Sequence, residues 1–188
     1  MIVGVVLAGG ASRRMGGQDK ATIELEGETL LERAVRRLRP QVDRTVVNAP
    51  PGAWNDSHVQ LVPDDLPDRP GPLAGLLAVM ERADEEDRIV SVAVDTPFFP
   101  ADLVARLTEY ETVAFAASDG RVHPVFAVWP ARLRDDLRAF LQGGERKILA
   151  FADRHGFAQV EFGAHPHDPF FNVNTPDDLA EAQRLAAA

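Results

Sequence analysis

The chain alternates short apolar runs with segments in which apolar residues recur every three or four positions. A short apolar run bounded by turn residues is typical of a strand buried on both faces, and the longer spacing is typical of a helix. In the first half the two patterns take turns, which predicts an α/β fold with a doubly wound, mostly parallel sheet. The strands expected there are 2–7, 42–47, 59–62 and 89–94, and the helices follow Thr29 and Pro72.

The second half carries a different signal. Two apolar segments, 112–117 and 122–128, flank Asp119-Gly120, which is typical of a tight hairpin because these residues accept a positive φ. An antiparallel strand is therefore expected beside the parallel ones. A short extended segment at 21–25, helices beginning near Pro100, Pro130 and Gly144, an edge strand at 157–162 and a last helix from Thr175 complete the prediction.

Composition narrows the classes of protein that fit this pattern. At 188 residues the chain has the length of one domain, 1–188, and its net charge of −9 argues against a general nucleic-acid binder. The sequence has no cysteine, so disulfides and thiol catalysis are excluded. No apolar run approaches the roughly 18 residues of a membrane span, and the apolar start lacks a charged leader. We expect a cytoplasmic protein that binds neither nucleic acid nor membrane.

A glycine-rich loop directly follows the first apolar run. It reads Leu-Ala-Gly-Gly-Ala-Ser-Arg-Arg-Met-Gly-Gly-Gln-Asp-Lys from Leu7 to Lys20. Glycine lets successive backbone N–H groups surround an anion, and Arg14 and Lys20 add full positive charges. The loop matches neither the P-loop nor the dinucleotide fingerprint. We interpret it as a polyphosphate-binding loop with Arg14 and Lys20 as catalytic cations, and a flexible turn with solvated charges is the alternative.

Three polar residues stand where predicted parallel strands end. These are Asn48, Asp64 and Asp95, and the carboxyl ends of parallel strands form one ligand-binding edge. Mg²⁺ takes one or two carboxylates together with substrate phosphates, so Asp95 is the predicted metal ligand, against the alternative of a capping aspartate. Asp64 either contacts nucleotide or metal, or belongs to a solvated turn.

Three further polar residues are not explained by the predicted helices and strands. Asn172 and Asn174 alternate along an extended piece, so both side chains point to one side, where they can complete a metal or phosphate shell. The alternative is a capping segment for the last helix. His123 lies beside the hairpin, and it either faces a second substrate or is a turn residue.

The motifs together resemble a known family. The loop from Leu7 to Lys20 is similar to that of the small nucleotidyltransferases. Together with Gly71-Pro-Leu-Ala-Gly75, Asp95-Thr-Pro-Phe98, His123-Pro124 and Asn172-Val-Asn-Thr-Pro176, it closely resembles the molybdenum cofactor guanylyltransferases over nearly the whole chain.

This resemblance implies a Rossmann-like nucleotidyltransferase fold and a Mg²⁺-dependent transfer of GMP from GTP to the phosphate of a molybdopterin-type cofactor, with release of pyrophosphate. Its nucleotide-binding half is expected at about 1–98 and its acceptor half at about 99–188, with His123, Asn172 and Asn174 on the acceptor side. Transient contact with molybdoenzymes that receive the product is also implied. The residues expected to bind GTP are Leu7, Ala8, Gly9, Gly10, Lys20, Asn48, Asp64 and Asp95.

Two alternatives stay open from the residues alone. The first is another nucleotidyltransferase on the same scaffold, such as a cytidylyltransferase for the same cofactor or a sugar-phosphate nucleotidyltransferase. The second is a non-catalytic GTP-binding module that carries the cofactor to a partner. Lys20 and Asp95 argue for catalysis, because a mere carrier has no need to stabilise a leaving pyrophosphate.

Overall fold

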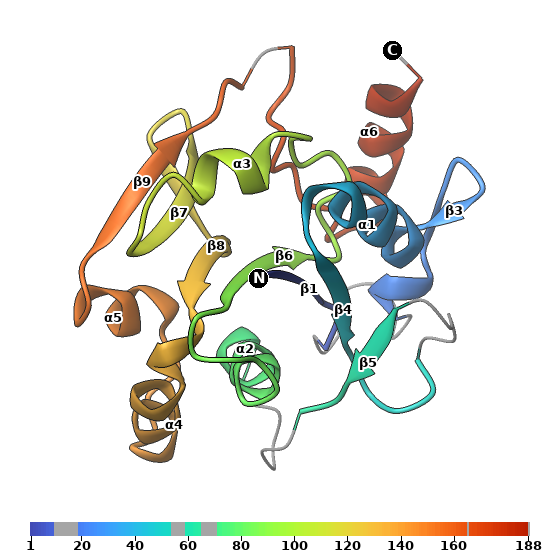
Figure 1. Cartoon of the computed structure of the whole chain (residues 1–188). Coiled ribbons are helices and arrows are strands. Elements are labelled where there is room, and N and C mark those ends of the chain that lie inside the picture. The colour runs from blue at the N-terminus through green and yellow to red at the C-terminus, as the bar shows by residue number, and fades with distance from the viewer. Residues whose placement is uncertain (10–18, 54–58, 65–70, 165, 188) are drawn as a thin grey trace.

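A computed structural model describes residues 1–9, 19–53, 59–64, 71–164 and 166–187. Within this part of the chain one seven-stranded sheet has the order β5-β4-β1-β6-β8-β7-β9, with helices on both faces (Figure 1). A separate pair, β2 and β3, forms a small hairpin. The strands are β1 (Ile2–Leu7), β2 (Glu24–Leu25), β3 (Glu28–Thr29), β4 (Arg44–Asn48), β5 (Gln60–Val62), β6 (Arg88–Ala93), β7 (Val113–Ser118), β8 (Arg121–Pro130) and β9 (Phe157–Glu161).

The strand directions confirm the predicted doubly wound fold. β1 pairs in parallel with β4 and β6, and β4 pairs in parallel with β5. β8 is antiparallel to both β6 and β7, while β9 returns to parallel pairing with β7. Asp119 and Gly120 form the predicted hairpin turn with φ of 47° and 74°. Because β8 runs against its neighbours, its first residues lie at the edge where β1 and β6 end.

Two apolar cores lie on opposite faces of the sheet. Val3 and Val5 of β1 face one core and Val6 faces the other, as the period of two in a strand requires. Helices α1 and α3 cover one face and α2 and α4 the other (Figure 1). The helices are α1 (Leu30–Leu38), α2 (Pro72–Met80), α3 (Leu103–Leu107), α4 (Arg134–Gln142), α5 (Ile148–Asp153) and α6 (Pro176–Ala186). None of the described helices has the length and apolar character that crossing a bilayer requires.

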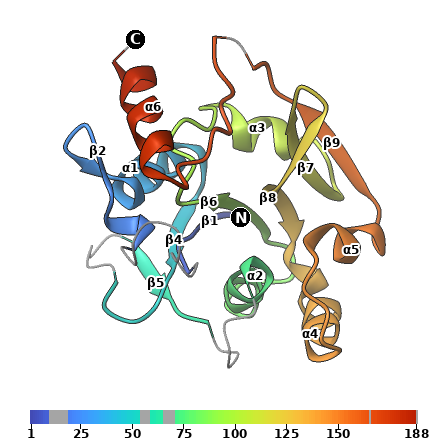
Figure 2. The ribbon, with the colours of Figure 1, turned by 180° about the vertical axis from the view of Figure 1, so that it is seen from behind.

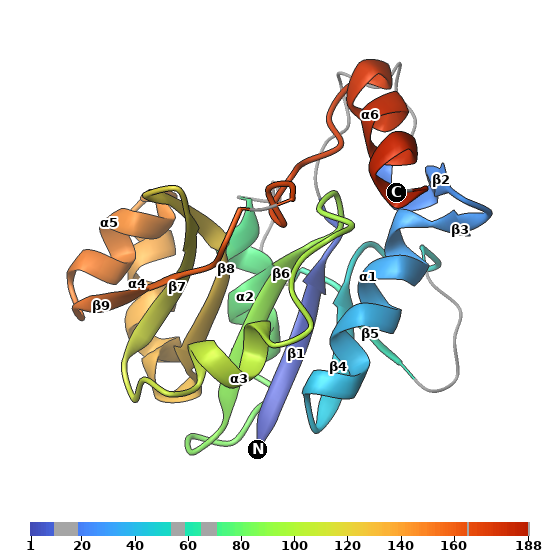
Figure 3. The same ribbon diagram turned by 90° about the horizontal axis from the view of Figure 1, so that it is seen from above.

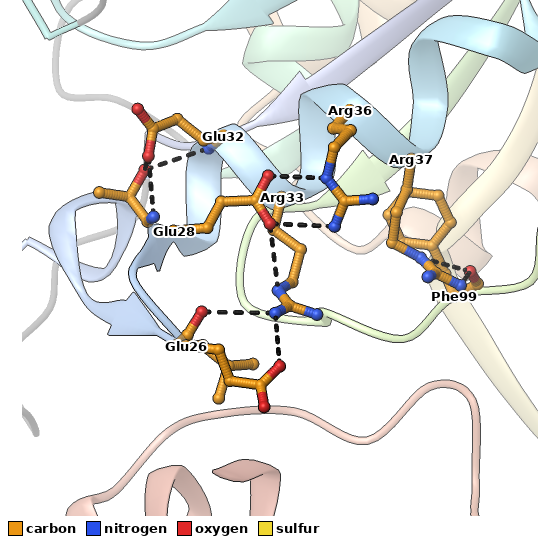
Figure 4. A network of polar contacts seen from close by, with 9 residues as sticks. Glu26, Glu28, Glu32, Arg33, Arg36, Arg37 and Phe99 are labelled. Atoms are coloured by element: carbon orange, nitrogen blue, oxygen red, sulfur yellow. Dashed lines mark hydrogen bonds and ion pairs between the residues drawn. The ribbon is translucent and has the colours of Figure 1, made fainter. Parts of the chain in front are cut away.

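Helix α1 follows Thr29, as predicted, and begins with a capping box. The Glu32 backbone N–H donates to the Thr29 hydroxyl at 3.2 Å, and the Thr29 N–H donates to the Glu32 carboxylate at 2.8 Å. On the next turn Arg36 donates two hydrogen bonds, at 2.8 and 2.9 Å, to Glu28 of β3 (Figure 4). This network fixes the β2–β3 hairpin on α1.

Arg37 of α1 links the helix to the segment that follows β6. Its guanidinium donates to the backbone carbonyl of Phe99 at 3.0 Å and lies over the Phe99 ring (Figure 4). It also donates to the backbone carbonyl of Phe98 at 3.1 Å. Burial lowers the pKa of the Arg37 guanidinium, with the neighbouring Arg36 adding to the effect. The carbonyls satisfy its donors, so the turn after Asp95 is held against α1.

Two local predictions are corrected. The segment expected to be extended at 21–25 begins instead as the 3₁₀ helix Lys20–Thr22, because the Asp19 side chain accepts from the Ala21 N–H at 3.0 Å and caps it. The helix expected to open at Pro130 begins there only as the 3₁₀ turn Ala131–Leu133, and α4 itself begins at Arg134. Pro130 is still part of β8, where it pairs with Arg88 of β6.

The segment that leads directly into α6 crosses the carboxyl-terminal edge of the parallel strands (Figures 2 and 3). We call residues 168–174 the strap. Its Val173 is fully buried and donates its N–H to the carbonyl of Asp95 at 2.8 Å. The strap therefore brings a distant part of the sequence to the ends of β1 and β6.

Candidate functional site

A cavity of about 340 Å³ lies at the carboxyl-terminal edge of β1, β4 and β6. The start of β8 forms another of its walls, with Arg121, His123 and Pro124. Most residues predicted for the site, from six separate stretches of sequence, line this one cavity. They are Leu7, Ala8, Gly9, Lys20, Asn48, Asp64, Asp95, His123 and Asn172. Their placement agrees with the predicted shared edge, and their roles in binding stay predictions.

Asn48 is a buried polar residue at the end of β4. Its side-chain amide donates to the Asp64 carboxylate at 2.7 Å and to the Val62 carbonyl at 3.0 Å. Asp64 is thus the partner of a buried amide at the cavity wall, and not only a solvated turn residue. Gly9 passes close to both, since a Cβ built there would lie 3.5 Å from the Asn48 Oδ1.

Gly75 of α2 has a role that its position in the Gly71–Gly75 motif did not reveal. A Cβ built on Gly75 would lie 2.1 Å from the Asn48 Oδ1 and 2.9 Å from a Leu7 methyl group. No side chain fits in that space. The glycine lets α2 pack against the strand ends while Asn48 keeps its orientation toward Asp64.

Lys20, the last residue of the glycine-rich loop, contacts Asp95 and the strap. Its ammonium Nζ lies 2.7 Å from the Asp95 Oδ2 and also donates to the Asn174 Oδ1. Both ion-paired side chains are about 20% exposed. Partial shielding makes such a pair stronger than one on the open surface. Three predicted site residues that are up to 154 positions apart in sequence therefore converge at one point.

The asparagines of the strap lie on either side of buried Val173. Asn174 accepts from Lys20, and Asn172 lines the cavity and accepts from the Thr96 hydroxyl at 2.6 Å. Thr96 itself is fully buried. Both asparagine side chains thus contact residues at or around Asp95, whereas the cap of α6 uses the Thr175 hydroxyl, which accepts from the Asp178 N–H at 3.2 Å, and the backbone N–H of Asn174, which donates to the Asp178 carboxylate at 3.0 Å.

The oxygen atoms that surround the Lys20 ammonium are of the kind that bind a hard divalent cation. The Asp95 carboxylate and the Asn174 amide oxygen point at the same cationic atom, so two oxygens already converge where a positive charge lies. Mg²⁺ prefers oxygen ligands and is often held by one or two carboxylates plus substrate phosphates. Within the described residues no group of three or more histidines, aspartates or glutamates surrounds a metal position. A site with few protein ligands that relies on substrate oxygens agrees with that finding.

At the start of β8, His123 belongs to a network that sequence reasoning missed. Its Nε2 lies 2.7 Å from the Ser118 Oγ, which donates to the Asp168 carboxylate at 3.0 Å. The His123 ring stacks on Phe170 with centroids 4.4 Å apart. Nothing local in the sequence pairs these residues, because Asp168 and Ser118 are 50 positions apart.

Two of the predicted residues, Gly10 and Arg14, lie outside the described residues. Their assignment to phosphate binding and catalysis stays a prediction from the sequence.

Comparison with known proteins places this geometry in a family. Residues 4–159 match the family model described as the MobA-like NTP transferase domain. The chain is 47% identical over 198 residues to a molybdenum cofactor guanylyltransferase of Bradyrhizobium. The aligned region covers 99% of this chain and 93% of the relative. It is 48% identical over 200 residues to the protein of the same name from Rhizobium johnstonii, covering 100% and 94%.

A solved structure shares the fold. The crystal structure of molybdopterin-guanine dinucleotide biosynthesis protein A from Archaeoglobus fulgidus superposes with a TM-score of 0.75 at 24% identity. The match covers 100% of this chain and 99% of that one.

Proposed function

The chain belongs to the MobA-like NTP transferase family and is a nucleotidyltransferase, and on that premise we propose that it transfers GMP from GTP to the terminal phosphate of a molybdopterin-type molybdenum cofactor. The products are the guanine dinucleotide form of the cofactor and pyrophosphate. The names of the relatives that are nearly half identical over the full length support the acceptor and the base.

The reaction needs an anionic nucleophile and a stabilised leaving group. An oxygen of the acceptor phosphate attacks the α-phosphorus of GTP, and the bond from that phosphorus to the bridging oxygen of the β-phosphate breaks, which releases pyrophosphate. A phosphate monoester has a second pKa of about 6, so it is already ionised near neutral pH. No general base is required, and catalysis rests on positioning and on compensation of charge.

On the nucleotide side, the end of β1 and the start of the glycine-rich loop would hold the triphosphate. Leu7, Ala8 and Gly9 line the cavity, and the absence of a side chain at Gly9 permits close approach of a ligand. Asn48, fixed by Asp64, would orient the nucleoside end. Lys20 would place its charge on the phosphoryl oxygens, with Arg14 and Gly10 of the loop assisting.

Asp95 would hold the metal ion, which we propose to be Mg²⁺. Bound there, the ion would neutralise charge on the α-phosphate and on the departing pyrophosphate. Asn174 is positioned to share its amide oxygen between this site and Lys20.

The acceptor would enter from the side of β8 and the strap, where His123 and Asn172 line the cavity. In this proposal residues 1–98 supply most of the nucleotide site and residues 99–188 most of the acceptor site, within one domain. Because GTP is a cytoplasmic metabolite, the proposal also places the enzyme in the cytoplasm. Brief contact with the molybdoenzymes that take the product belongs to the same proposal.

The observation that carries the proposal is the contact of Lys20, which lines the cavity, with Asp95 of the same wall and with Asn174 of the strap. A cation from the glycine-rich loop, a strand-end carboxylate and an amide from the strap form a site suited to phosphoryl transfer. A module that only carried the cofactor would not require this arrangement.

The test is pyrophosphate release from the purified protein in Mg²⁺ with molybdopterin-type cofactor, comparing GTP, CTP, ATP and UTP. We expect release with GTP that depends on the cofactor and on the metal, and none after chelation. Release with CTP instead would keep the mechanism and assign the sister cytidylyltransferase activity. GTP binding without release from any nucleotide would support the carrier and overturn the proposal.

A further inference from the structure

The network of His123, Ser118 and Asp168 fixes which nitrogen of the histidine carries a proton. Ser118 has a single hydroxyl hydrogen, and it donates this to the Asp168 carboxylate at 3.0 Å. An ionised carboxylate can only accept. The 2.7 Å contact between Ser118 Oγ and His123 Nε2 therefore needs the proton on Nε2. This leaves Nδ1 of a neutral ring with its lone pair available.

The carboxylate that orients the network is itself held in place. The Phe170 backbone N–H donates to the same Asp168 Oδ1 at 2.9 Å, within the turn that begins the strap. Phe170 also stacks on the His123 ring and lies edge-on to Phe126 and Phe162. The ring plane of His123 and the direction of its nitrogens are thus fixed by packing as well as by hydrogen bonds.

The surroundings favour the neutral form of the histidine. Burial lowers the pKa of the His123 imidazole, and Arg121 acts in the same direction, while Asp168 and Glu161 act against it. A neutral imidazole has one donor and one acceptor nitrogen. With Nε2 committed to Ser118, the acceptor is Nδ1.

The arrangement is not that of a serine hydrolase. There the histidine lies between the serine and the carboxylate and removes the serine proton. Here Ser118 lies between the histidine and Asp168, and the serine is 3% exposed. Ser118 is therefore a relay for orientation and not a nucleophile.

His123 lies where the acceptor would enter. It is the third residue of β8, whose reversed direction brings it to the cavity edge, and Pro124, Val125 and Phe126 line the same wall. The Nδ1 atom makes no hydrogen bond with any residue in the part of the chain that the structure describes. An apolar wall with one oriented acceptor suits a flat heterocycle that has an N–H group.

We propose that Nδ1 of His123 accepts a hydrogen bond from a ring or exocyclic N–H of the heterocycle that bears the acceptor phosphate, with Ser118 and Asp168 as positioning residues that hold the Nε2–H tautomer. The inference rests on the proposed function, since it assigns a contact to the acceptor of that reaction. It makes His123 a selector for acceptors with an N–H donor.

The tautomer is measured on the free protein by two-bond ¹H–¹⁵N correlation spectra of ¹⁵N-labelled chain, which separate a protonated from an unprotonated ring nitrogen. We expect His123 to be protonated at Nε2 in the wild type and in Asp168→Asn, whose amide oxygen still accepts from Ser118. In Ser118→Ala and Asp168→Ala the two tautomers are expected to mix. A wild-type ring protonated at Nδ1 would overturn the inference.

The contact is measured by steady-state kinetics with molybdopterin-type cofactor as the varied substrate. In His123→Asn the amide oxygen takes the place of Nδ1, whereas in His123→Gln the amide lies near the place of Nε2. Loss of one neutral hydrogen bond corresponds to up to about tenfold in affinity. We expect an acceptor KM about tenfold higher in His123→Gln, within about threefold of wild type in His123→Asn, and an unchanged KM for GTP in both.

The outcomes separate this inference from the proposed function. If the wild type transfers GMP but both His123 variants keep the wild-type acceptor KM, the inference fails and the function stands. Equal rises of the acceptor and GTP KM in His123→Gln would also overturn it, since they indicate general disruption. If the wild type releases no pyrophosphate with any nucleotide, the proposed function fails and the acceptor contact fails with it.

Discussion

Single atoms decide the shape of the cavity at the ends of β1 and β4, where we propose that the nucleotide binds. Asn48 has its amide nitrogen committed to Val62 and Asp64, so its oxygen faces α2 at Gly75. A side chain at Gly75 would displace the Asn48 amide, because the close-packed strand backbone behind Asn48 cannot move away.

Gly75→Ala is therefore expected to disturb nucleotide binding from outside the cavity. The new Cβ would lie 2.1 Å from the Asn48 Oδ1, so the amide must leave its hydrogen bonds. We expect a loss of about 1–3 kcal/mol in unfolding free energy and a KM for GTP raised about tenfold. Urea unfolding and initial rates measure the two effects. Gly163→Ala is the control, since a Cβ there meets nothing within 4 Å. Equal behaviour of the two variants would contradict the assignment.

Asp95→Asn tests the residue on which the proposed metal depends. The substitution keeps the size of the side chain but removes the charge that pairs with Lys20 and would hold Mg²⁺. We expect the protein to fold and the rate of pyrophosphate release to fall at least about a hundredfold. Asp135→Asn, which breaks an exposed ion pair with Arg138 on α4, serves as the control and keeps its rate. A wild-type rate in Asp95→Asn would remove Asp95 from the mechanism.

Among the elements, the strap and α6 act as one unit. Asn174 is held by Lys20 on one side and by the cap of α6 on the other, because its backbone N–H donates to Asp178 at 3.0 Å. Thr175 and Asp178 form a reciprocal capping box. The start of α6 thus contributes to the position of an amide in the site.

This link gives a pH dependence. The hydrogen bond from the Asn174 N–H, joined by those from Thr175, holds the pKa of the Asp178 carboxyl below its usual range. A group whose folded pKa is lowered stabilises the protein above its unfolded pKa of about 3.9, and this contribution is lost as pH falls through the folded pKa. The wild-type protein should therefore be more stable to unfolding than Asp178→Asn near neutral pH, and this difference in stability should disappear below about pH 4.

The measurement is the urea midpoint of wild type and Asp178→Asn at about pH 6 and about pH 3, compared as a difference because other carboxyls titrate in the same range. Asp177→Asn makes the same charge change in the same turn of α6, and its difference from wild type should change less between the two pH values. If the urea midpoints of wild type and Asp178→Asn differ by the same amount at both pH values, the proposed stabilisation by the ionised Asp178 carboxylate is refuted.

On the scale of the whole molecule, ligand binding should couple the two halves of the sheet. Nucleotide and metal would contact the ends of β1, β4 and β6 as well as Lys20, which the strap holds from the far end of the chain. Ligand at about 100 times its Kd adds about 2.7 kcal/mol to the stability of the folded state.

For a chain of this size we therefore expect GTP with Mg²⁺ to raise Tm by about 5–10 °C. Differential scanning calorimetry measures the shift, and Asp95→Asn is expected to lose the part that depends on Mg²⁺. A rise of the same size with Mg²⁺ and inorganic phosphate alone would show that the nucleoside contributes nothing to binding.

The sequence by itself determined the elements and most of one edge of the sheet. The period of two or of three to four along the chain is a local property, so β1 was predicted to the residue and the first helix was predicted to follow Thr29. Because the carboxyl ends of parallel strands share an edge, the order of strands and helices along the chain was enough to bring Asn48, Asp64 and Asp95 together. The hairpin at Asp119-Gly120 followed from its required φ values.

Only the tertiary structure decided which distant segments meet. The position of β8 between β6 and β7, the contact of Gly75 with Asn48, and the pairing of Asp168 with Ser118 have no local periodicity to reveal them. Lys20 and Asn174 are 154 positions apart, and their contact exists because the strap packs Val173 behind Asp95. Local patterns reflect backbone geometry within a few residues, whereas such contacts arise from the collective packing of the whole chain.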